Sequence, residues 1–123
     1  MTAQYLPHRH STVANADLSA LQFTLVTVDT STAKLASAAA ATAPILGVLE
    51  NKPTSGQTAE WAGPGCIAKV KAGGNIAPQD KLTGTTGGAA IATTTTGQYY
   101  VGFALATGVS GDLVPVLIAP GIV

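Results

Sequence analysis

The sequence predicts an all-β domain, a small β-barrel or sandwich of short strands with Gly-rich turns. Residues 21 to 29, LQFTLVTVD, alternate apolar and polar side chains and include several β-branched residues, the pattern of a half-buried strand. Residues 67 to 82 continue with single apolar residues among polar residues and glycines, so further short strands are expected at close spacing. An internal match within the chain is the third observation.

The chain resembles itself at a constant offset. Residues 45 to 48, ILGV, match residues 100 to 103, YVGF, and the Ser-Gly pair that begins at Ser55 matches the pair that begins at Ser110. Each copy is predicted to form strand, tight turn and strand, which gives two similar hairpin units. The Ala-rich run before Pro44 favours a helix by propensity. The second copy has TTTTG at that place, so we expect at most a short helical turn.

We expect residues 18 to 123 to form a single β domain and residues 1 to 17 to form an extended, flexible N-terminal arm. The arm segment is polar and shows no sustained period. A chain of 123 residues is long enough for one domain with a real core, and two full domains are not expected. Pro115, inside the last apolar segment, predicts an edge strand or a bulge.

The composition favours recognition by shape over recognition by charge. Six Lys and Arg residues balance six Asp and Glu residues, so no net field attracts nucleic acid or an acidic membrane surface. The single cysteine, Cys66, cannot form an internal disulfide, and we expect it to be a small buried side chain. We expect no signal peptide and no membrane span, and hence a protein made in a cytoplasm.

The residues that could carry chemistry do not form a catalytic or metal-binding pattern. Ser110 lies in GVSGD, where the second glycine is one position too close for a nucleophile elbow. The only histidines, His8 and His10, lie in the predicted arm, so Ser110 has no expected base. Two histidines without a nearby cysteine or carboxylate are also too few for a zinc site. We therefore expect no enzyme activity, metal, cofactor or small-molecule substrate.

Two groups of lysines need a closer look. Asp80 and Lys81 lie at a predicted turn, as in the biotinyl and lipoyl carrier domains, but no clear second strand begins after them, so a solvated turn is favoured. Lys69 and Lys71 share one face of a predicted strand. A solvated face is favoured for them, with contact to an acidic partner as the alternative.

Candidate contact residues lie in the arm and among the aromatic side chains. In the arm, aromatic, basic and histidine side chains are grouped, and we expect them to be contacts that order when a partner is bound: Tyr5, Leu6, His8, Arg9 and His10. Trp61, Tyr99 and Tyr100 are candidates for an oligomer or partner interface. Burial in the core is the favoured alternative for Trp61.

The second half of the chain, from KVKAGG to LIAPG, resembles the small capsid decoration, or cement, proteins of tailed bacteriophages. Their pattern is Ala-Gly before an apolar residue, an Asp with an apolar pair, a Gly-rich turn, an apolar-Gly-apolar-Ala strand and a closing Gly-Asp/Glu-x-Val-x-Val strand. The matching residues here are Ala72, Gly73, Ile76, Asp80, Leu82, Val101, Gly102, Phe103, Ala104, Gly111, Asp112, Val114 and Val116. The first copy, ILGVLENKPTSGQTAEW, is less typical.

The resemblance implies a structural virion protein with a β-barrel-like domain. Such proteins are usually trimeric, bind the outer surface of the expanded head at threefold positions and stabilise it by bridging neighbouring subunits. The implied partners are the major capsid protein and two further copies of the chain, with no nucleic acid and no membrane. The grouped arm residues would then be the contacts to the capsid. An alternative function is a glycan- or receptor-binding β module displayed on a virion or cell surface.

Overall fold

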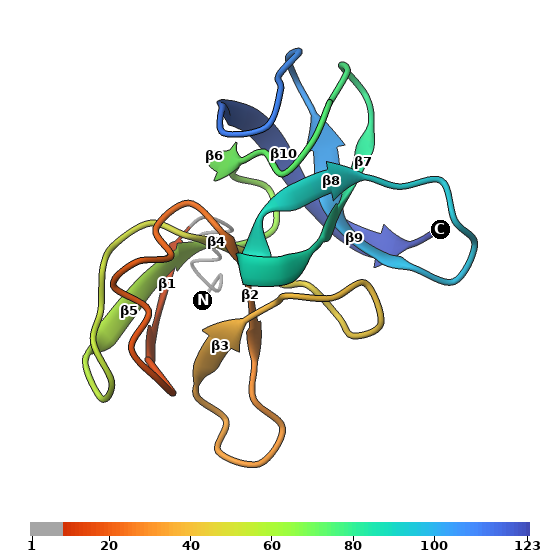
Figure 1. The fold of residues 1–123 in the computed structure, drawn as a ribbon. Helices are drawn as coiled ribbons and strands as arrows, with labels where there is room; N and C mark the ends of the chain where they lie inside the picture. The colour runs from red at the N-terminus through yellow and green to blue at the C-terminus, as the bar shows by residue number, and fades with distance from the viewer. Residues whose placement is uncertain (1–8) are drawn as a thin grey trace, which may run out of the picture.

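The computed structural model describes residues 9 to 123 and consists mainly of β-strands and turns (Figure 1). The first five strands are β1 (Arg9–Val13), β2 (Leu25–Val28), β3 (Leu35–Ser37), β4 (Gly47–Leu49) and β5 (Thr58–Ala62). The next five are β6 (Ile67–Lys71), β7 (Lys81–Gly84), β8 (Ala90–Ala92), β9 (Tyr99–Ala104) and β10 (Leu113–Ile122), with one 3-10 turn, η1 (Thr86–Gly88), after β7. The prediction of an all-β domain is confirmed.

The strands form two antiparallel sheets of five strands, one from each half of the chain. The first sheet has the order β1-β5-β4-β2-β3, and the second has the order β6-β10-β9-β7-β8. In Figure 1 the first sheet runs in colour from red to yellow-green and the second from green to blue. Neither sheet closes into a barrel within residues 9 to 123, so the sandwich is the correct alternative.

The two predicted hairpin units are present and share one register. In the first unit, Val48 of β4 lies opposite Ala62 of β5. In the second unit, Phe103 of β9 lies opposite Leu117 of β10. Phe103 follows Val48, and Leu117 follows Ala62, by the same number of residues that separates ILGV from YVGF in the sequence. The internal match is therefore a structural repeat.

The repeat extends beyond the hairpins to all five strands of each half. The strand order of the second sheet is that of the first with every number raised by five. A single parallel bridge joins Ala14, just after β1, to Leu35 at the start of β3. The bridge between Ala72 and Ala90 repeats it in the second half. The two halves thus share a common backbone plan although most of their side chains differ.

The core has one cluster that the two halves share and one that belongs to the first half. The shared cluster includes Leu25, Val48, Val70, Leu82, Val101 and Val116, all essentially without exposed surface. The second cluster includes Leu18, Val26, Leu35 and Leu49. Because side chains of both sheets interdigitate in the larger cluster, burial of apolar surface holds the halves together.

The main departure from the sequence-based prediction is at the N-terminal end. The sequence predicts a flexible arm over residues 1 to 17, but residues 9 to 13 form β1, which pairs with β5 along its whole length. His10 and Thr12 turn inward between three exposed residues, so a polar segment is held through ladder hydrogen bonds and polar side-chain contacts. Residues 1 to 8 of the predicted arm lie outside the described residues.

Three smaller expectations also need correction. The strand predicted over residues 21 to 29 begins only at Leu25, because Phe23 adopts a positive φ of 67° in a turn. The Ala-rich run is not helical, since its backbone bonds to both sheets, for example from the Tyr99 N–H to the Ala41 carbonyl at 3.0 Å. Pro115 lies in a central strand and not at an edge: it is opposite Lys69 of β6, and its carbonyl accepts the Leu105 N–H at 2.9 Å just beyond the end of β9. The proline lacks only an N–H donor at this position.

Candidate functional site

The start of β1 is held against β5 by an aromatic contact. His10 lies directly opposite Trp61 in the β1–β5 ladder, and their ring centroids are 4.7 Å apart at an interplanar angle of 31°. The Trp61 indole N–H donates a hydrogen bond of 3.1 Å to the Thr12 hydroxyl. Gly63 leaves the room for the imidazole, because a Cβ at that position would lie 2.7 Å from the His10 ring. Trp61 is half-buried and packs on the core of the first half.

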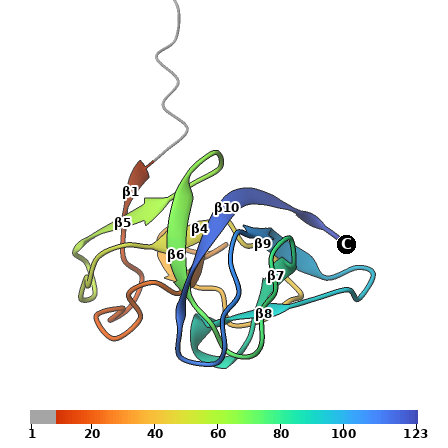
Figure 2. The ribbon, with the colours of Figure 1, turned by 90° about the horizontal axis from the view of Figure 1, so that it is seen from above.

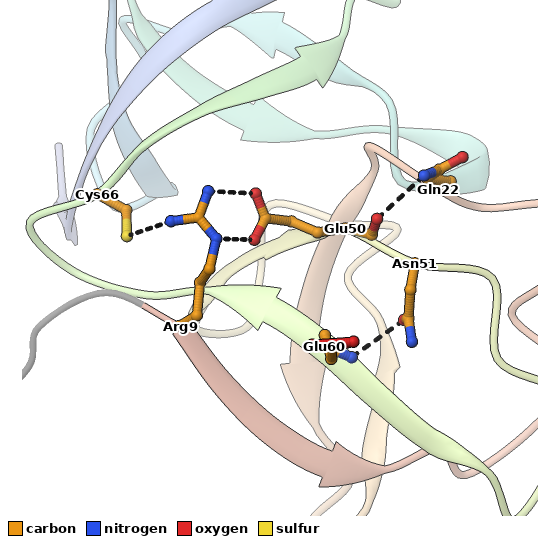
Figure 3. Close-up of polar contacts among 6 residues, drawn as sticks. All are labelled: Arg9, Gln22, Glu50, Asn51, Glu60 and Cys66. Atoms are coloured by element: carbon orange, nitrogen blue, oxygen red, sulfur yellow. Dashed lines mark hydrogen bonds and ion pairs between the residues drawn. The ribbon is translucent and has the colours of Figure 1, made fainter.

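A charged pair lies one residue closer to the N-terminus. The Arg9 guanidinium contacts both carboxylate oxygens of Glu50, with Nε to Oε1 at 2.7 Å and Nη2 to Oε2 at 2.9 Å (Figure 3). Its Nη1 lies 3.6 Å from the buried sulfur of Cys66. The Arg9 side chain is 58% exposed and that of Glu50 is 21% exposed. A pair this exposed adds little stability, so its main effect is to fix the position of the chain at residue 9.

The segment that presents Glu50 is fixed by hydrogen bonds on both sides. The Gln22 amide donates to the Glu50 carbonyl at 3.0 Å (Figure 3). The Asn51 side chain accepts from the Glu60 N–H at 3.0 Å and donates to the Thr58 carbonyl at 3.1 Å. Because these bonds hold the turn between β4 and β5, Glu50 is pre-positioned for the guanidinium. We call Arg9, His10, Glu50 and Trp61 the N-terminal anchor.

Of the residues predicted to contact partners, the structure brings Arg9, His10 and Trp61 together. Tyr5, Leu6 and His8 lie outside the described residues. Nothing in the sequence pairs Glu50 with the arm, because 41 residues separate it from Arg9. The anchor was missed for that reason. Cys66 is buried, at 4% exposure, as predicted.

Tyr99 and Tyr100 lie in β9, in the other sheet from Trp61. Tyr99 packs against the shared core and lines a small cleft of about 210 Å³ with residues 44 to 46 and 120 to 122. The centroid of the Tyr100 ring lies 5.7 Å from that of Phe103, and the Lys81 ammonium lies 5.3 Å from the Tyr100 centroid. Both tyrosines are half-buried. Because adjacent residues of a strand point to opposite faces of its sheet, the two tyrosines do not share one aromatic surface.

Lys81 is not placed as a carrier lysine would be. It is the first residue of β7, opposite Phe103 of β9, and its carbonyl accepts the Thr93 N–H at 2.8 Å. A lysine within a ladder is not at an exposed hairpin tip. The Asp80 carboxylate accepts the Ala77 N–H at 2.8 Å and closes the turn before β7.

The remaining polar groups form turns. Ser110 lies in the exposed turn between β9 and β10, where the Asp112 carboxylate accepts the Val109 N–H at 3.0 Å and Gly111 has a φ of 94°. His10, in the first sheet, is engaged with Trp61.

Across residues 9 to 123, no three His, Cys, Asp or Glu side chains gather as metal ligands would. The same part of the chain has no helix with the length and hydropathy of a membrane span.

One surface was underestimated from the sequence. The outward side chains of β6 and β10 include three large apolar residues, Ile67, Leu113 and Leu117, which are 60%, 46% and 37% exposed. Lys69 and Lys71 lie among them. The available signal was that LVPVLI of β10 is apolar on both faces, whereas a half-buried strand has one polar face.

The fold is shared with a protein of known structure. The chain is similar to the N base of the head fiber gp8.5 of bacteriophage phi29, with a TM-score of 0.70 and 21% sequence identity. The similarity covers 90% of this chain and 92% of that one. No protein-family model matches the chain, and no curated protein matches it in sequence. At this level of identity the likeness shows the fold alone.

Proposed function

We propose that this chain is a structural virion protein that binds the outer surface of an expanded phage capsid. The observation that carries the proposal is the fold shared with the base of a phage head fiber over 90% of the chain. The decoration-protein pattern in the second half of the sequence supports it separately. The proposed partner is the major capsid protein, and the proposed role is structural rather than enzymatic.

The physical mechanism is the addition of contacts across the seams between capsid subunits. Once the chain is bound on both sides of a seam, separating the subunits must also break the added interface. A homotrimer strengthens this effect, because three equivalent patches meet a site of matching symmetry and the second and third bind at high effective concentration. We propose the homotrimer as the assembled form.

The N-terminal anchor supports a role for the segment that precedes β1. Arg9 and His10 are engaged with Glu50 and Trp61, so they fix the point from which the chain continues toward the N-terminus. We propose that Tyr5, Leu6 and His8 then supply contacts to a neighbouring capsid subunit. Arg9 and His10 act mainly by positioning that segment.

Binding to shells tests the proposed function. The purified chain is mixed with expanded shells of the encoding phage that lack it, and the shells are sedimented at increasing protein concentration. We expect saturable binding at a fixed number of sites and a rise in the temperature at which the shells come apart. Shells that sediment without the chain, at concentrations well above micromolar, would refute the proposal.

A shortened chain tests the proposed N-terminal contacts. Deletion of residues 2 to 8 leaves the whole of β1 in place, so the fold and the anchor are expected to be retained. We expect weaker binding and a smaller thermal effect on shells. For comparison, Arg9→Ala in the full-length chain loosens the anchor but keeps the segment, and it is expected to weaken binding less than the deletion does. Unchanged binding after the deletion would show that the contacts lie elsewhere.

A further inference from the structure

The outward side of β6 and β10 is an apolar strip with lysines and without carboxylates. The two strands pair in register, with Ile67 opposite Leu117 and Leu113 opposite Lys71. We call the outward residues of these strands the β6–β10 face: Ile67, Lys69, Lys71, Leu113, Pro115 and Leu117. Figure 2 shows β6 in green and β10 in blue side by side in the middle of the view. Isolated exposed apolar residues are ordinary, but exposed apolar residues that gather on two paired strands mark an interaction surface.

The first repeat provides an internal comparison for this face. β1 and β5 occupy the places of β6 and β10, so each position of the face has an equivalent. The pair of Leu113 and Lys71 corresponds to Thr58 and Val13. Three further positions carry polar residues in the first repeat: Arg9, Ser11 and Glu60 lie where the second repeat has Ile67, Lys69 and Pro115. The sixth position, Leu117, corresponds to Ala62, which is buried in the shared core.

The comparison shows which side chains of the face are not required to form this pair of strands. Arg9 and Thr58 of the first half occupy the positions of Ile67 and Leu113, and the strands pair in the same way. Isoleucine and leucine at these outward positions are therefore not required for folding. Exposed aliphatic side chains also lower solubility, so their presence favours a partner that covers them.

The charge of the face defines the chemistry of that partner. Lys69 and Lys71 are exposed, and no ion pair involves them within residues 9 to 123. Two copies meeting through this face about a two-fold axis would set lysines near lysines around the same apolar strip, which is unfavourable. A nucleic acid would gain little from the aliphatic side chains at its centre, because phosphate contacts dominate such binding. A protein surface with carboxylates beside an apolar strip fits both features.

We infer that the β6–β10 face docks on an acidic, partly apolar protein surface. Resting on the proposed function, this surface belongs to the capsid shell. The face then supplies the apolar contact area, and the two lysines add attraction and orientation at its rim. Binding through it weakens as salt concentration rises, since the lysines are exposed to solvent.

A double variant and its counterpart in the other repeat test the inference. The test variant is Lys69→Glu with Leu113→Glu, and the control is Ser11→Gln with Thr58→Glu at the equivalent ladder positions. Residue 11 of the control receives glutamine because Glu60 lies directly opposite it, and two facing carboxylates would destabilise the sheet. All four side chains are exposed, so both variants are expected to fold, which circular dichroism and thermal unfolding check. Shell binding is measured by co-sedimentation. The test variant is expected to bind at least about tenfold more weakly, and the control like the wild type.

The outcomes separate this inference from the proposed function. Wild-type binding to shells with equal binding of the test variant overturns the inference alone. No binding of the wild type to shells overturns both proposals. A test variant that changes the oligomeric state in analytical ultracentrifugation assigns the face to contacts between copies and overturns docking. Retention of a labelled DNA duplex by the wild type but not by the test variant assigns it to nucleic acid instead.

Discussion

Alanine at Gly102 tests how closely the repeated hairpins are packed. A Cβ at this position would overlap the carbonyl oxygen of Leu117 on the neighbouring strand and lie 2.9 Å from its carbonyl carbon. Two carbon atoms need about 3.5 Å, so β9 and β10 would separate by at least about 0.6 Å, and by more to clear the oxygen. A separation of this size breaks the adjacent ladder hydrogen bonds.

The expected loss of stability follows from these two effects. Overpacking costs about 1 to 3 kcal/mol, and the loss of about two ladder hydrogen bonds adds about 2 kcal/mol. We expect Gly102→Ala to lower the free energy of unfolding by about 3 to 5 kcal/mol, a large share of the roughly 5 to 15 kcal/mol that a domain has. At about 4 °C per kcal/mol, the Tm would fall by about 12 to 20 °C.

The assay is urea unfolding followed by circular dichroism, with Gly74→Ala as the matched control. At Gly74 a Cβ would meet only Ile91, at 3.7 Å, and the backbone is outside the positive-φ region. This control is expected to be neutral, or stabilising by up to about 1 kcal/mol. Gly47 is the equivalent of Gly102 in the first repeat and its Cβ would overlap the Ala62 carbonyl oxygen, so Gly47→Ala should behave like Gly102→Ala. If Gly102→Ala stays within about 1 kcal/mol of Gly74→Ala, the reasoning is wrong.

Three further predictions concern buried polar groups, the anchor and pH. Thr83→Val is expected to stabilise the protein by up to about 1 kcal/mol in urea unfolding, because the Thr83 hydroxyl is buried without a hydrogen-bond partner among residues 9 to 123. Thr24→Val removes a 2.6 Å hydrogen bond and is expected to destabilise the protein by about 1 kcal/mol. A Thr24→Val variant more stable than Thr83→Val would contradict this reasoning. His10→Ala is expected to cost about 1 kcal/mol and to shift the emission of Trp61, the only tryptophan, to longer wavelength; an unchanged spectrum would count against the stacking. Backbone hydrogen bonds from the residues two and three positions further on hold the pKa of Asp29 below its ordinary value of 3.8. Its contribution to stability is therefore present above that value and lost as pH falls through the lowered pKa, so wild type and Asp29→Ala should converge in acid unfolding below about pH 3.8, and a constant difference would refute this.

The hairpins could be predicted because their signals are local. The apolar run of residues 113 to 118, the matching Ser-Gly turns and the match of ILGV to YVGF all lie within short segments, and they identified β4, β5, β9 and β10. The glycines at 47 and 102 were found as part of the repeat. Their reason, the approach of a carbonyl from the next strand, is visible only in the folded chain.

The anchor and the first strand depend on distant partners. RHSTV has no apolar face, and its ladder partners are residues 58 to 62, far along the chain, so no periodic pattern indicates a strand. Arg9 meets Glu50 only because the turn after β4 is held by Gln22 and Asn51. The β6–β10 face left a signal in the sequence, the continuous apolar run LVPVLI of β10, but its difference from the first repeat is visible only once the two sheets are aligned.

The position of the anchor at the very start of β1 has a mechanical consequence. If residues 1 to 8 are bound to another protein, a force pulling on that contact first acts on the folded domain at Arg9. The load is then carried first by the ion pair with Glu50 and by the ring contact between His10 and Trp61, before any ladder bond further along β1 is strained. A strand at the edge of a sheet is otherwise peeled away one bond at a time. The two side-chain contacts therefore oppose the separation of β1 from β5 at the residue where that separation would begin.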